Sequence, residues 1–483
     1  MPDSSGRPLT YRVVAGGVRL VLRLFFREIA VEGREHVPDD RGGLVVSWHP
    51  NGLLDPALIL TPFPRRIVFG ARHGLLRWPV LGPLMRSMGT VPIYRAVDEA
   101  GMTEAERREA NEASLDALAG AVADGAYAAL FPEGVSHDDP HLARLKTGAA
   151  RLYARARALA EARGRPTPVI LPVGLHYDAK AVFRSDVLVE FHPPMALPPA
   201  LDRVPGPDDA QAHARALTDA IETELVEAVH ATEDWGLHRL MNRARALLRA
   251  EGDRRLGAAP SEQRIADRVE VFSQIWEGYR VRRASHPRAV ERLRADLTAY
   301  DRRLRALGLA DADLDQPPRV STPLLLLLIV GQALGLAFVV VPLVVLGFVV
   351  NAGPYWLLKP AARRFSKAEK DTATVKILGG LVLFPLAWAL AGAAAALAHA
   401  RLHAAFPELP DTPVLTGLVV ALLSAVGGAL ALHLTEVAQA VARSARVWFV
   451  RARHPERLEA LRTDRAELHD RLLVLAEGLE LAA

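Results

Sequence analysis

Residues 44–55 read Leu-Val-Val-Ser-Trp-His-Pro-Asn-Gly-Leu-Leu-Asp, an apolar run that leads directly into a polar motif. The chain repeats this arrangement further along, where the apolar run 127–131 leads into Phe-Pro-Glu-Gly at residues 131–134. Short apolar runs bounded by turn residues are typical of buried strands. Open α/β sheets place ligands just beyond the carboxyl ends of their strands, so we expect His49, Asp55 and Glu133 to lie together there.

Similar apolar runs recur between residues 29 and 198, at 67–69, 90–93, 169–173 and 187–191, with helical segments between them. One of these helices is predicted to begin at the capping box Thr103-Glu-Ala-Glu106 and to end near Gly125. The alternation predicts an α/β domain over residues 29–200, with a mainly parallel sheet flanked by helices.

Composition limits the class of protein. The chain has 483 residues, half of them apolar, which is too long for one hydrophobic core. Its net charge of +4 does not indicate nucleic acid, although the predominance of arginine suits phosphate and anionic lipid headgroups. The absence of cysteine excludes disulfides, thiolate nucleophiles and cysteine-based zinc sites, and is compatible with a reducing cytosol.

The N-terminal segment, residues 1–28, is predicted to form an amphipathic helix that lies in a membrane interface. Arg12, Arg19, Arg23 and Arg27 fall on one side of a helical wheel, and apolar residues fill the remainder. The alternative is a helix that packs on the core of the adjacent domain. The arginines recur too regularly for a signal peptide, so we expect the chain to begin in the cytoplasm.

Residues 201–315 are charged and poor in strand-forming residues, which predicts an appended helical module. Two long antiparallel helices are expected within it, at 261–283 and 286–307, with a break near His286-Pro287. No catalytic motif is visible in this part of the sequence.

The last third is typical of a membrane protein, with apolar runs at 323–354, 377–398 and 414–434. The last two match the roughly 20 residues that cross a bilayer, whereas the first is too long for one span and too short for two. We predict a re-entrant or hairpin segment followed by two transmembrane helices. Basic residues outside the helix pair place both termini in the cytoplasm, so residues 440–483 are predicted to be a cytoplasmic amphipathic tail that binds a partner or the helical module.

The first polar motif suits acyl transfer to a hydroxyl. A hydroxyl is a poor nucleophile near neutral pH, and His49 could take its proton during attack while Asp55 orients the imidazole. The alternative is that Asp55 only caps a helix starting at Pro56 and that His49 is an ordinary loop residue.

Four blocks in order resemble the glycerolipid acyltransferase superfamily, the phospholipid/glycerol acyltransferases. They are His-Pro-Asn-Gly-Leu-Leu-Asp at 49–55, Gly-Thr-Val-Pro-Ile-Tyr-Arg at 89–95, Phe-Pro-Glu-Gly-Val-Ser-His at 131–137 with Lys-Thr-Gly at 146–148, and Val-Ile-Leu-Pro-Val at 169–173. Two departures are similar to the fungal-type glycerol-3-phosphate/dihydroxyacetone-phosphate acyltransferases and their bacterial relatives: five residues separate His49 from Asp55, and Ser136-His137-Asp138 stand where Thr-Arg-Ser is usual.

The resemblance implies acyl transfer from acyl-CoA or acyl-carrier protein to the hydroxyl of glycerol-3-phosphate or dihydroxyacetone phosphate, with no resident cofactor and no metal. It implies a cell inner-membrane location, with the catalytic domain on the cytoplasmic face among membrane lipids. His49 and Asp55 would be catalytic. The implied acceptor-binding residues are Arg95, Glu133, Gly134, Ser136, His137, Lys146 and Pro172, with phosphate bound by Arg95 and by His137 or Lys146.

Two alternatives remain at this stage. A lysophosphatidate or other lysophospholipid acyltransferase would use the same mechanism on a different acceptor. A lipid-binding or scaffolding membrane protein would keep the fold without catalysis.

Overall fold

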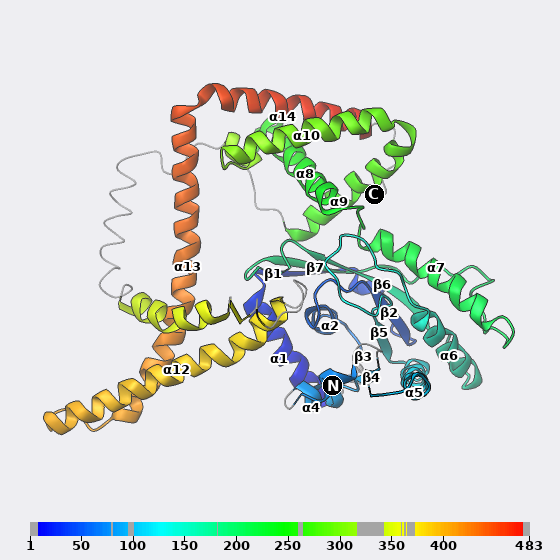
Figure 1. Cartoon of the computed structure of the whole chain (residues 1–483), viewed down its shortest axis with the longest axis horizontal. Helices are drawn as coiled ribbons and strands as arrows, with labels where there is room; N and C mark the ends of the chain where they lie inside the picture. Colours follow the sequence, from blue (N-terminus) through cyan, green and yellow to red (C-terminus); the bar gives the residue numbers. More distant parts are fainter. Residues whose placement is uncertain are drawn as a thin grey trace. The chain divides into compact units, whose positions relative to one another are not determined.

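The computed structural model describes residues 8–78, 81–94, 101–180, 182–258, 264–315, 342–358, 360–361, 364 and 372–476. The chain divides into two compact units (Figure 1). The first comprises Met1–His238, Gln263–Ser273 and Ala368–Thr374, and the second comprises Arg239–Glu262, Gln274–Lys367 and Val375–Ala483.

The first unit is built on a sheet that has seven strands in the described residues, in the order β1-β7-β6-β2-β5-β3-β4. Its pairings are parallel except that between β6 and β7, which confirms the predicted mainly parallel sheet. The strands are β1 (Glu28–Glu32), β2 (Gly43–Ser47), β3 (Ile67–Arg72), β4 (Val91–Ile93), β5 (Tyr127–Leu130), β6 (Val169–Tyr177) and β7 (Asp186–Phe191).

Helices cover both faces of this sheet. On one face, α5 (Glu104–Ala123), α6 (Gly148–Ala162) and α7 (Ala210–Ala228) bury apolar side chains against β2, β5 and β6. On the other, Phe63, just after α2 (Leu54–Leu60), contacts the rings of Tyr127 and Phe191. The shorter elements of the unit are η1 (Arg34–His36), α3 (His73–Leu76) and α4 (Leu81–Ser87). The predicted capping box is confirmed, because Thr103 and Glu106 bond each other's backbone at the start of α5.

The first unit extends beyond residue 200, where the sequence places its end and the start of the 201–315 module. Helix α7 lies in that range but packs on α6 and β6. Its buried residues Leu217, Ile221 and Leu225 belong to the same core cluster as β2 and α6, so this helix is part of the sheet domain.

A buried group of histidines surrounds Glu190 on the β6–β7 pair. The Nε2 atoms of His176 and His192 lie 3.2 and 3.6 Å from Glu190 Oε2, and the ring of His230 stacks on His176 at 5.0 Å between centroids. Burial, followed by the charge of His176, lowers the pKa of His230 from 6.5 to about 3. Burial likewise lowers the pKa of His192.

We expect acid to destabilise the first unit through these histidines. A depressed folded-state pKa means that the unfolded chain binds the proton first, so the stabilisation is complete above pH 6.5 and is lost as pH falls toward 3. Asparagine tolerates the left-handed φ of 49° at this position, so His230→Asn should reduce the loss of stability as pH falls. Denaturant unfolding of the full chain across this pH range measures the free energy of unfolding. If this free energy falls with the same slope against pH in the wild type and the variant, the assignment to His230 is contradicted.

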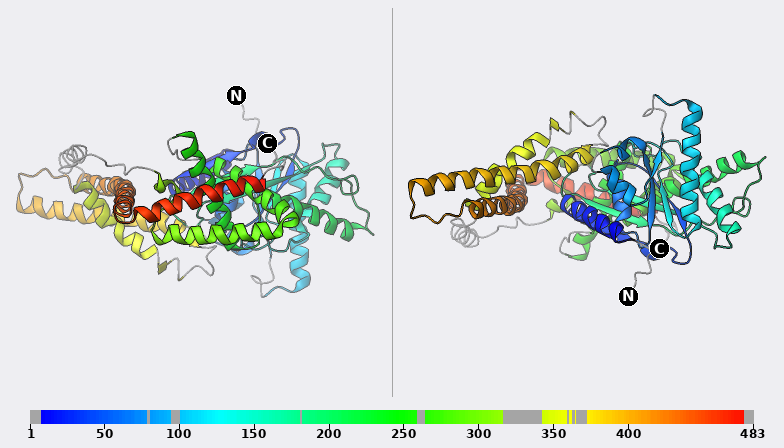
Figure 2. Two further views of the ribbon diagram at one scale, coloured as in Figure 1. Left: turned by 90° about the horizontal axis from the view of Figure 1, so that it is seen from above. Right: turned by 90° about the horizontal axis from the view of Figure 1, so that it is seen from below.

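The second unit is helical. Besides the membrane-type helices described next, it contains most of α8 (Trp235–Leu256) and α9 (Ile265–Ser285), and all of α10 (Pro287–Ala306), η2 (Asp311–Leu314) and α14 (Pro455–Ala476). The chain breaks at His286, between α9 and α10, because Pro287 takes the first helical position. Helices α10 and α14 lie side by side and share one apolar cluster (Figures 1 and 2). The tail segment 455–476 therefore packs within its own chain.

Two helices of the described chain are long and apolar enough to cross a membrane, at Thr374–Ala405 and Pro413–Thr435. They belong to α12 (Thr372–Ala405) and α13 (Pro413–Arg453), and contain the predicted spans 377–398 and 414–434. Helix α13 continues to Arg453, so residues 440–453, expected in the tail, extend this helix. The two helices lie side by side (Figure 2), with Gly392 and Gly417 at a close backbone contact.

A shorter apolar helix, Pro342–Leu358, joins the pair. Asn351 on this helix donates to Ser424 O of α13 at 3.0 Å and accepts from Trp388 Nε1 of α12 at 2.9 Å. Satisfied amides of this kind hold apolar helices together. The rest of the predicted re-entrant segment, residues 323–341, lies outside the described residues.

Candidate active site

Two neighbouring parallel strands bring the polar motifs together. Strand β2 ends at Ser47, two residues before His49, and β5 ends at Leu130, three residues before Glu133. The strands pair in parallel from Gly43 opposite Tyr127, so their carboxyl ends lie side by side. The backbone N–H of His49 donates to Glu133 Oε1 at 2.9 Å. The proximity expected from the sequence is therefore present.

A buried carboxylate fixes the orientation of the His49 ring. Its Nδ1 lies 2.7 Å from Asp55 Oδ2, and because a carboxylate only accepts, this nitrogen carries the proton and leaves Nε2 as the acceptor. The imidazole stacks on Phe131 with the ring centroids 4.1 Å apart and the planes 15° apart. Its side chain is 20% exposed, whereas that of Asp55 is fully buried. The imidazole is therefore partly open to solvent, whereas its carboxylate partner is not.

Asp55 is held by donors on both of its oxygens. Oδ2 also accepts the backbone N–H of Asn51 at 2.7 Å, and Oδ1 accepts the hydroxyl of Tyr177 at 2.5 Å. Helix α2 begins at Leu54 without a side-chain cap, so the interpretation of Asp55 as only a helix cap does not hold. Burial, and then the Asp55 carboxylate, raise the pKa of Tyr177 well above its usual value, which keeps this hydroxyl protonated as a donor.

Glu133 organises the second loop. Besides His49, it accepts the backbone N–H of Ala143 at 2.7 Å and a hydrogen bond from His137 Nε2. The side chain is buried, with both oxygens bonded to protein. These three hydrogen bonds leave one acceptor site on Oε1 for the role implied by the resemblance, accepting a hydrogen bond from the acceptor's hydroxyls.

His137 is also used within the loop. Its backbone N–H donates to His49 O at 3.2 Å, and its Nδ1 accepts the N–H of Asp139 at 3.2 Å while Nε2 faces Glu133. Both ring nitrogens are therefore bonded to protein, and His137 offers no donor to a phosphate in this arrangement.

Lys146 keeps an exposed ammonium next to this loop. Gly134 has a left-handed φ of 68°, a conformation that favours glycine, and it lies next to the flexible end of Lys146. Ser136 is partly buried in the same loop, and Pro172 is buried in β6 opposite Val46. Arg95 lies outside the described residues.

Lys180, in the connection between β6 and β7, links the two motif loops. Its Nζ donates to Pro50 O at 3.2 Å and forms an ion pair with Asp138, and its carbonyl accepts Asn51 Nδ2 at 3.0 Å. Like Tyr177, it was not among the residues expected from the sequence. Among the described residues, no group of three or more histidines and carboxylates is placed to hold a metal ion.

Two family models match this chain. Residues 28–176 match the model described as Acyltransferase, which contains the His49, Asp55 and Glu133 site. Residues 252–480 match the model described as the glycerol-3-phosphate acyltransferase 2 C-terminal domain. The chain belongs to the glycerolipid acyltransferase superfamily. The family resemblance of the four blocks is thereby confirmed, and this acyltransferase carries its helical and apolar segments in a recognised C-terminal domain.

Curated relatives share part of this acyltransferase. An uncharacterized acyltransferase of Schizosaccharomyces pombe is 23% identical over 375 residues, which cover 60% of this chain and 53% of the relative. Glycerol-3-phosphate O-acyltransferase 1 of Saccharomyces cerevisiae is 25% identical over 249 residues, which cover 51% and 31%. The chain thus spans about half of the first relative and under a third of the second.

A solved structure, the 1-acyl-sn-glycerophosphate acyltransferase PlsC of Thermotoga maritima, aligns with a TM-score of 0.30 and 21% identity. The alignment covers 44% of this chain and 79% of that one.

Proposed function

We propose that this acyltransferase moves a fatty acyl group from an acyl thioester to the hydroxyl of glycerol-3-phosphate. The observation that carries the chemistry is the partly exposed His49 imidazole, with Nδ1 fixed on the buried Asp55. The choice of acceptor is supported by the glycerol-3-phosphate acyltransferase C-terminal model over residues 252–480. Dihydroxyacetone phosphate, which carries the same phosphate and primary hydroxyl, is the related acceptor.

The reaction proceeds by direct transfer. His49 Nε2 removes the proton of the acceptor's primary hydroxyl as its oxygen attacks the thioester carbonyl, and Asp55 stabilises the resulting imidazolium. Collapse of the tetrahedral intermediate breaks the carbon–sulfur bond. The thiolate of coenzyme A or acyl-carrier protein takes the proton from His49, which restores the neutral base. No acyl-enzyme and no resident cofactor take part.

Phosphate binding is assigned to Lys146 together with Arg95. Lys146 presents an exposed ammonium beside the loop that holds Glu133, and a lysine binds phosphate as a point charge. His137 is left out because both of its ring nitrogens are bonded within the loop.

We place the protein in the cell inner membrane, with the first unit on the cytoplasmic face. Two helices of the second unit have the length and composition of membrane spans. The arginine-rich C-terminal end of α13 and the basic residues after Leu358 support a cytoplasmic position for the segments that flank the pair.

An acceptor panel tests the function. Purified full-length protein in detergent is given glycerol-3-phosphate, dihydroxyacetone phosphate or lysophosphatidate, each with acyl-CoA and with acyl-carrier protein. We expect glycerol-3-phosphate to be the acceptor with the highest kcat/KM. The product of that reaction should be lysophosphatidate. A higher value with lysophosphatidate as acceptor would favour the alternative acyltransferase, and no turnover with any pair would favour the scaffold.

Replacing Tyr177 by phenylalanine tests how Asp55 acts. Loss of the hydroxyl removes the donor to Asp55 Oδ1, so the carboxylate interacts more strongly with the His49 imidazolium. We expect the acidic limb of the pH profile of kcat/KM to move to higher pH, with KM for the acceptor nearly unchanged. An unshifted profile with raised KM would show that Tyr177 only shapes the site.

A further inference from the structure

Helix α1 (Leu9–Phe25) has two apolar sectors. Tyr11, Leu22 and Phe25 are buried against the first unit, which accounts for one sector. The other is exposed to solvent, and each of its four large residues is at least 60% exposed: Leu9, Val13, Leu20 and Leu24. At 100° per residue these four fall within about 60° of one another. The helix therefore packs on its own domain and still presents an apolar stripe.

Charge lines one edge of this stripe. Arg12 and Arg23 are exposed and fall immediately beside it on the wheel, while Arg19 donates to Thr61 O at 2.5 Å. The helix contains no acidic residue. An apolar stripe edged only by positive charge matches a bilayer surface with anionic headgroups, in which apolar residues enter the acyl boundary and arginines contact phosphates.

The apolar surface continues past the end of the helix. Val182 and Phe183, in the connection between β6 and β7, are 55% and 45% exposed. The Phe183 ring contacts that of Phe25 at 5.9 Å between centroids, and the backbone N–H of Arg184 donates to Phe25 O at 2.7 Å. Arg184 has a left-handed φ of 64°, so a tight turn held by α1 presents this pair.

We propose that Val182 and Phe183 form, with the exposed stripe of α1, one membrane-contact surface that inserts into the interface of an anionic bilayer. The sequence predicted a membrane role for the helix alone; the structure adds the β6–β7 connection. The inference rests on the proposed membrane location, which the two span-like helices of the same chain support.

This surface is joined to the catalytic loops. Lys180, two residues before Val182, bonds the carbonyl of Pro50 and pairs with Asp138, so the inserted connection and the His49 loop are held together. Insertion of Val182 and Phe183 therefore places the His49 loop at the bilayer surface, where the fatty chain of donor and product can stay in lipid.

Single-cysteine labelling tests the surface, because the native chain has no cysteine. Val182→Cys and Leu20→Cys each receive an environment-sensitive fluorophore, with Val204→Cys as the control, an apolar loop residue of the same unit that is 39% exposed. The full-length protein is reconstituted in nanodiscs of phosphatidylcholine with or without phosphatidylglycerol. Quenching is measured with nitroxide-labelled lipid and with aqueous iodide.

We expect nitroxide lipid to quench positions 182 and 20 several-fold more than position 204, and iodide to show the reverse order. Phosphatidylglycerol should strengthen the effect, and Arg12→Gln with Arg23→Gln should remove that increment. Iodide access at 182 equal to that at 204 would overturn the proposal. So would shielding that grows with protein concentration without nitroxide quenching, which identifies a second copy as the occupant. The readout involves no turnover, so its failure is separate from failure of the proposed function.

Discussion

Replacing His49 with alanine is expected to lower kcat by roughly 10²- to 10⁴-fold, the usual contribution of a positioned general base. The Nδ1 of His49 is fixed on the buried Asp55, which leaves Nε2 to accept the proton. Alanine has no proton acceptor to replace this nitrogen. The measurement is the steady-state rate of lysophosphatidate formation by the purified full-length enzyme with saturating acyl thioester and glycerol-3-phosphate.

The matched control is His141→Ala. His141 is an exposed residue in the same loop region as His137, so its loss should leave kcat within about twofold of the wild type. The unfolding midpoints of both variants should match the wild type, which separates a catalytic loss from a folding defect. A His49→Ala loss of less than about tenfold would remove His49 as the base.

Asp55→Asn provides a second, graded comparison. The amide keeps the size of the side chain and can still accept from Tyr177, but it cannot stabilise the imidazolium that forms during attack. A kcat reduced towards that of His49→Ala, with an unchanged KM, would show that the pair acts as a unit.

Local sequence patterns predicted most of the strands and helices of the fold. Strands β2, β5, β6 and β7 are buried runs of apolar residues, and the pattern located each of them. Strand β1 was missed because it is a partly exposed edge strand with glutamate at both ends, Glu28 and Glu32, so its run is short. Helix α7 was assigned to the wrong module because its charged composition masks five buried apolar positions on one face.

The residues of the candidate site also fall into two groups, those that the sequence motifs predicted and those that only the structure revealed. His49, Asp55 and Glu133 stand in contiguous motifs, so their proximity follows from the order of the strands. Tyr177 reaches Asp55 across 122 residues of sequence, and Lys180 reaches Pro50 across 130. No local pattern marks either residue, since each acts only through strand β6 lying beside β2. The bonds of both His137 ring nitrogens are local, to Glu133 and Asp139, and depend on the loop conformation.

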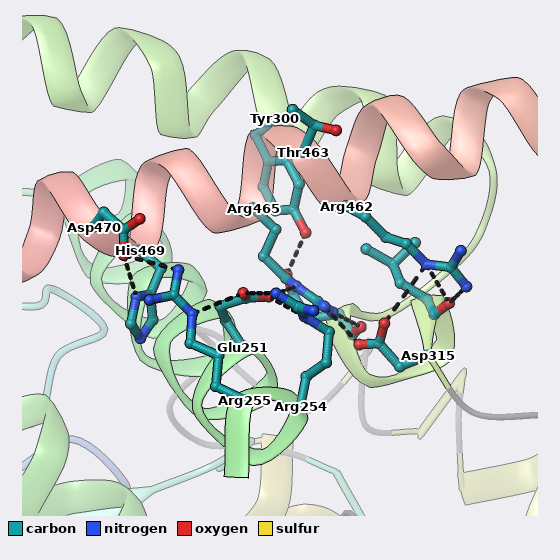
Figure 3. A network of polar contacts seen from close by, with 12 residues as sticks. Glu251, Arg254, Arg255, Tyr300, Asp315, Arg462, Thr463, Arg465, His469 and Asp470 are labelled. Carbon is teal, nitrogen blue, oxygen red and sulfur yellow. Dashed lines mark hydrogen bonds and ion pairs between the residues drawn. The ribbon is translucent and has the colours of Figure 1, made fainter. Parts of the chain in front are cut away.

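The second large effect is expected in the C-terminal unit, where Arg465 of α14 is completely buried. Figure 3 shows its guanidinium beside Glu251 and Asp315. Nε donates to Glu251 Oε2 of α8 at 3.0 Å, Nη1 donates to the carbonyl of Asp311 at 2.9 Å, and Nη2 pairs with Asp315 at 2.6 Å. Burial opposes ionisation of Glu251, but its arginine partners lower the pKa to about 2, so the carboxylate stays charged.

We expect Arg465→Ala to destabilise this unit by about 3–5 kcal/mol, because it removes the buried guanidinium that joins Glu251, the Asp311 carbonyl and Asp315, and opens a cavity beneath α14. The matched control is Arg471→Ala on the same helix. Arg471 pairs with Asp296 at 2.8 Å on the surface, where such a pair contributes only about 0–1 kcal/mol.

The measurement uses a cysteine introduced at Leu461, a buried position of α14 in the apolar cluster shared with α10. In the otherwise native chain and in Arg471→Ala this thiol should react slowly with a maleimide, because α14 stays packed. In Arg465→Ala the thiol should react orders of magnitude faster, since its rate follows the population of the opened helix. If Arg465→Ala and Arg471→Ala label at the same rate, the buried guanidinium does not stabilise the packing of α14. The apolar cluster alone would then hold the helix in place.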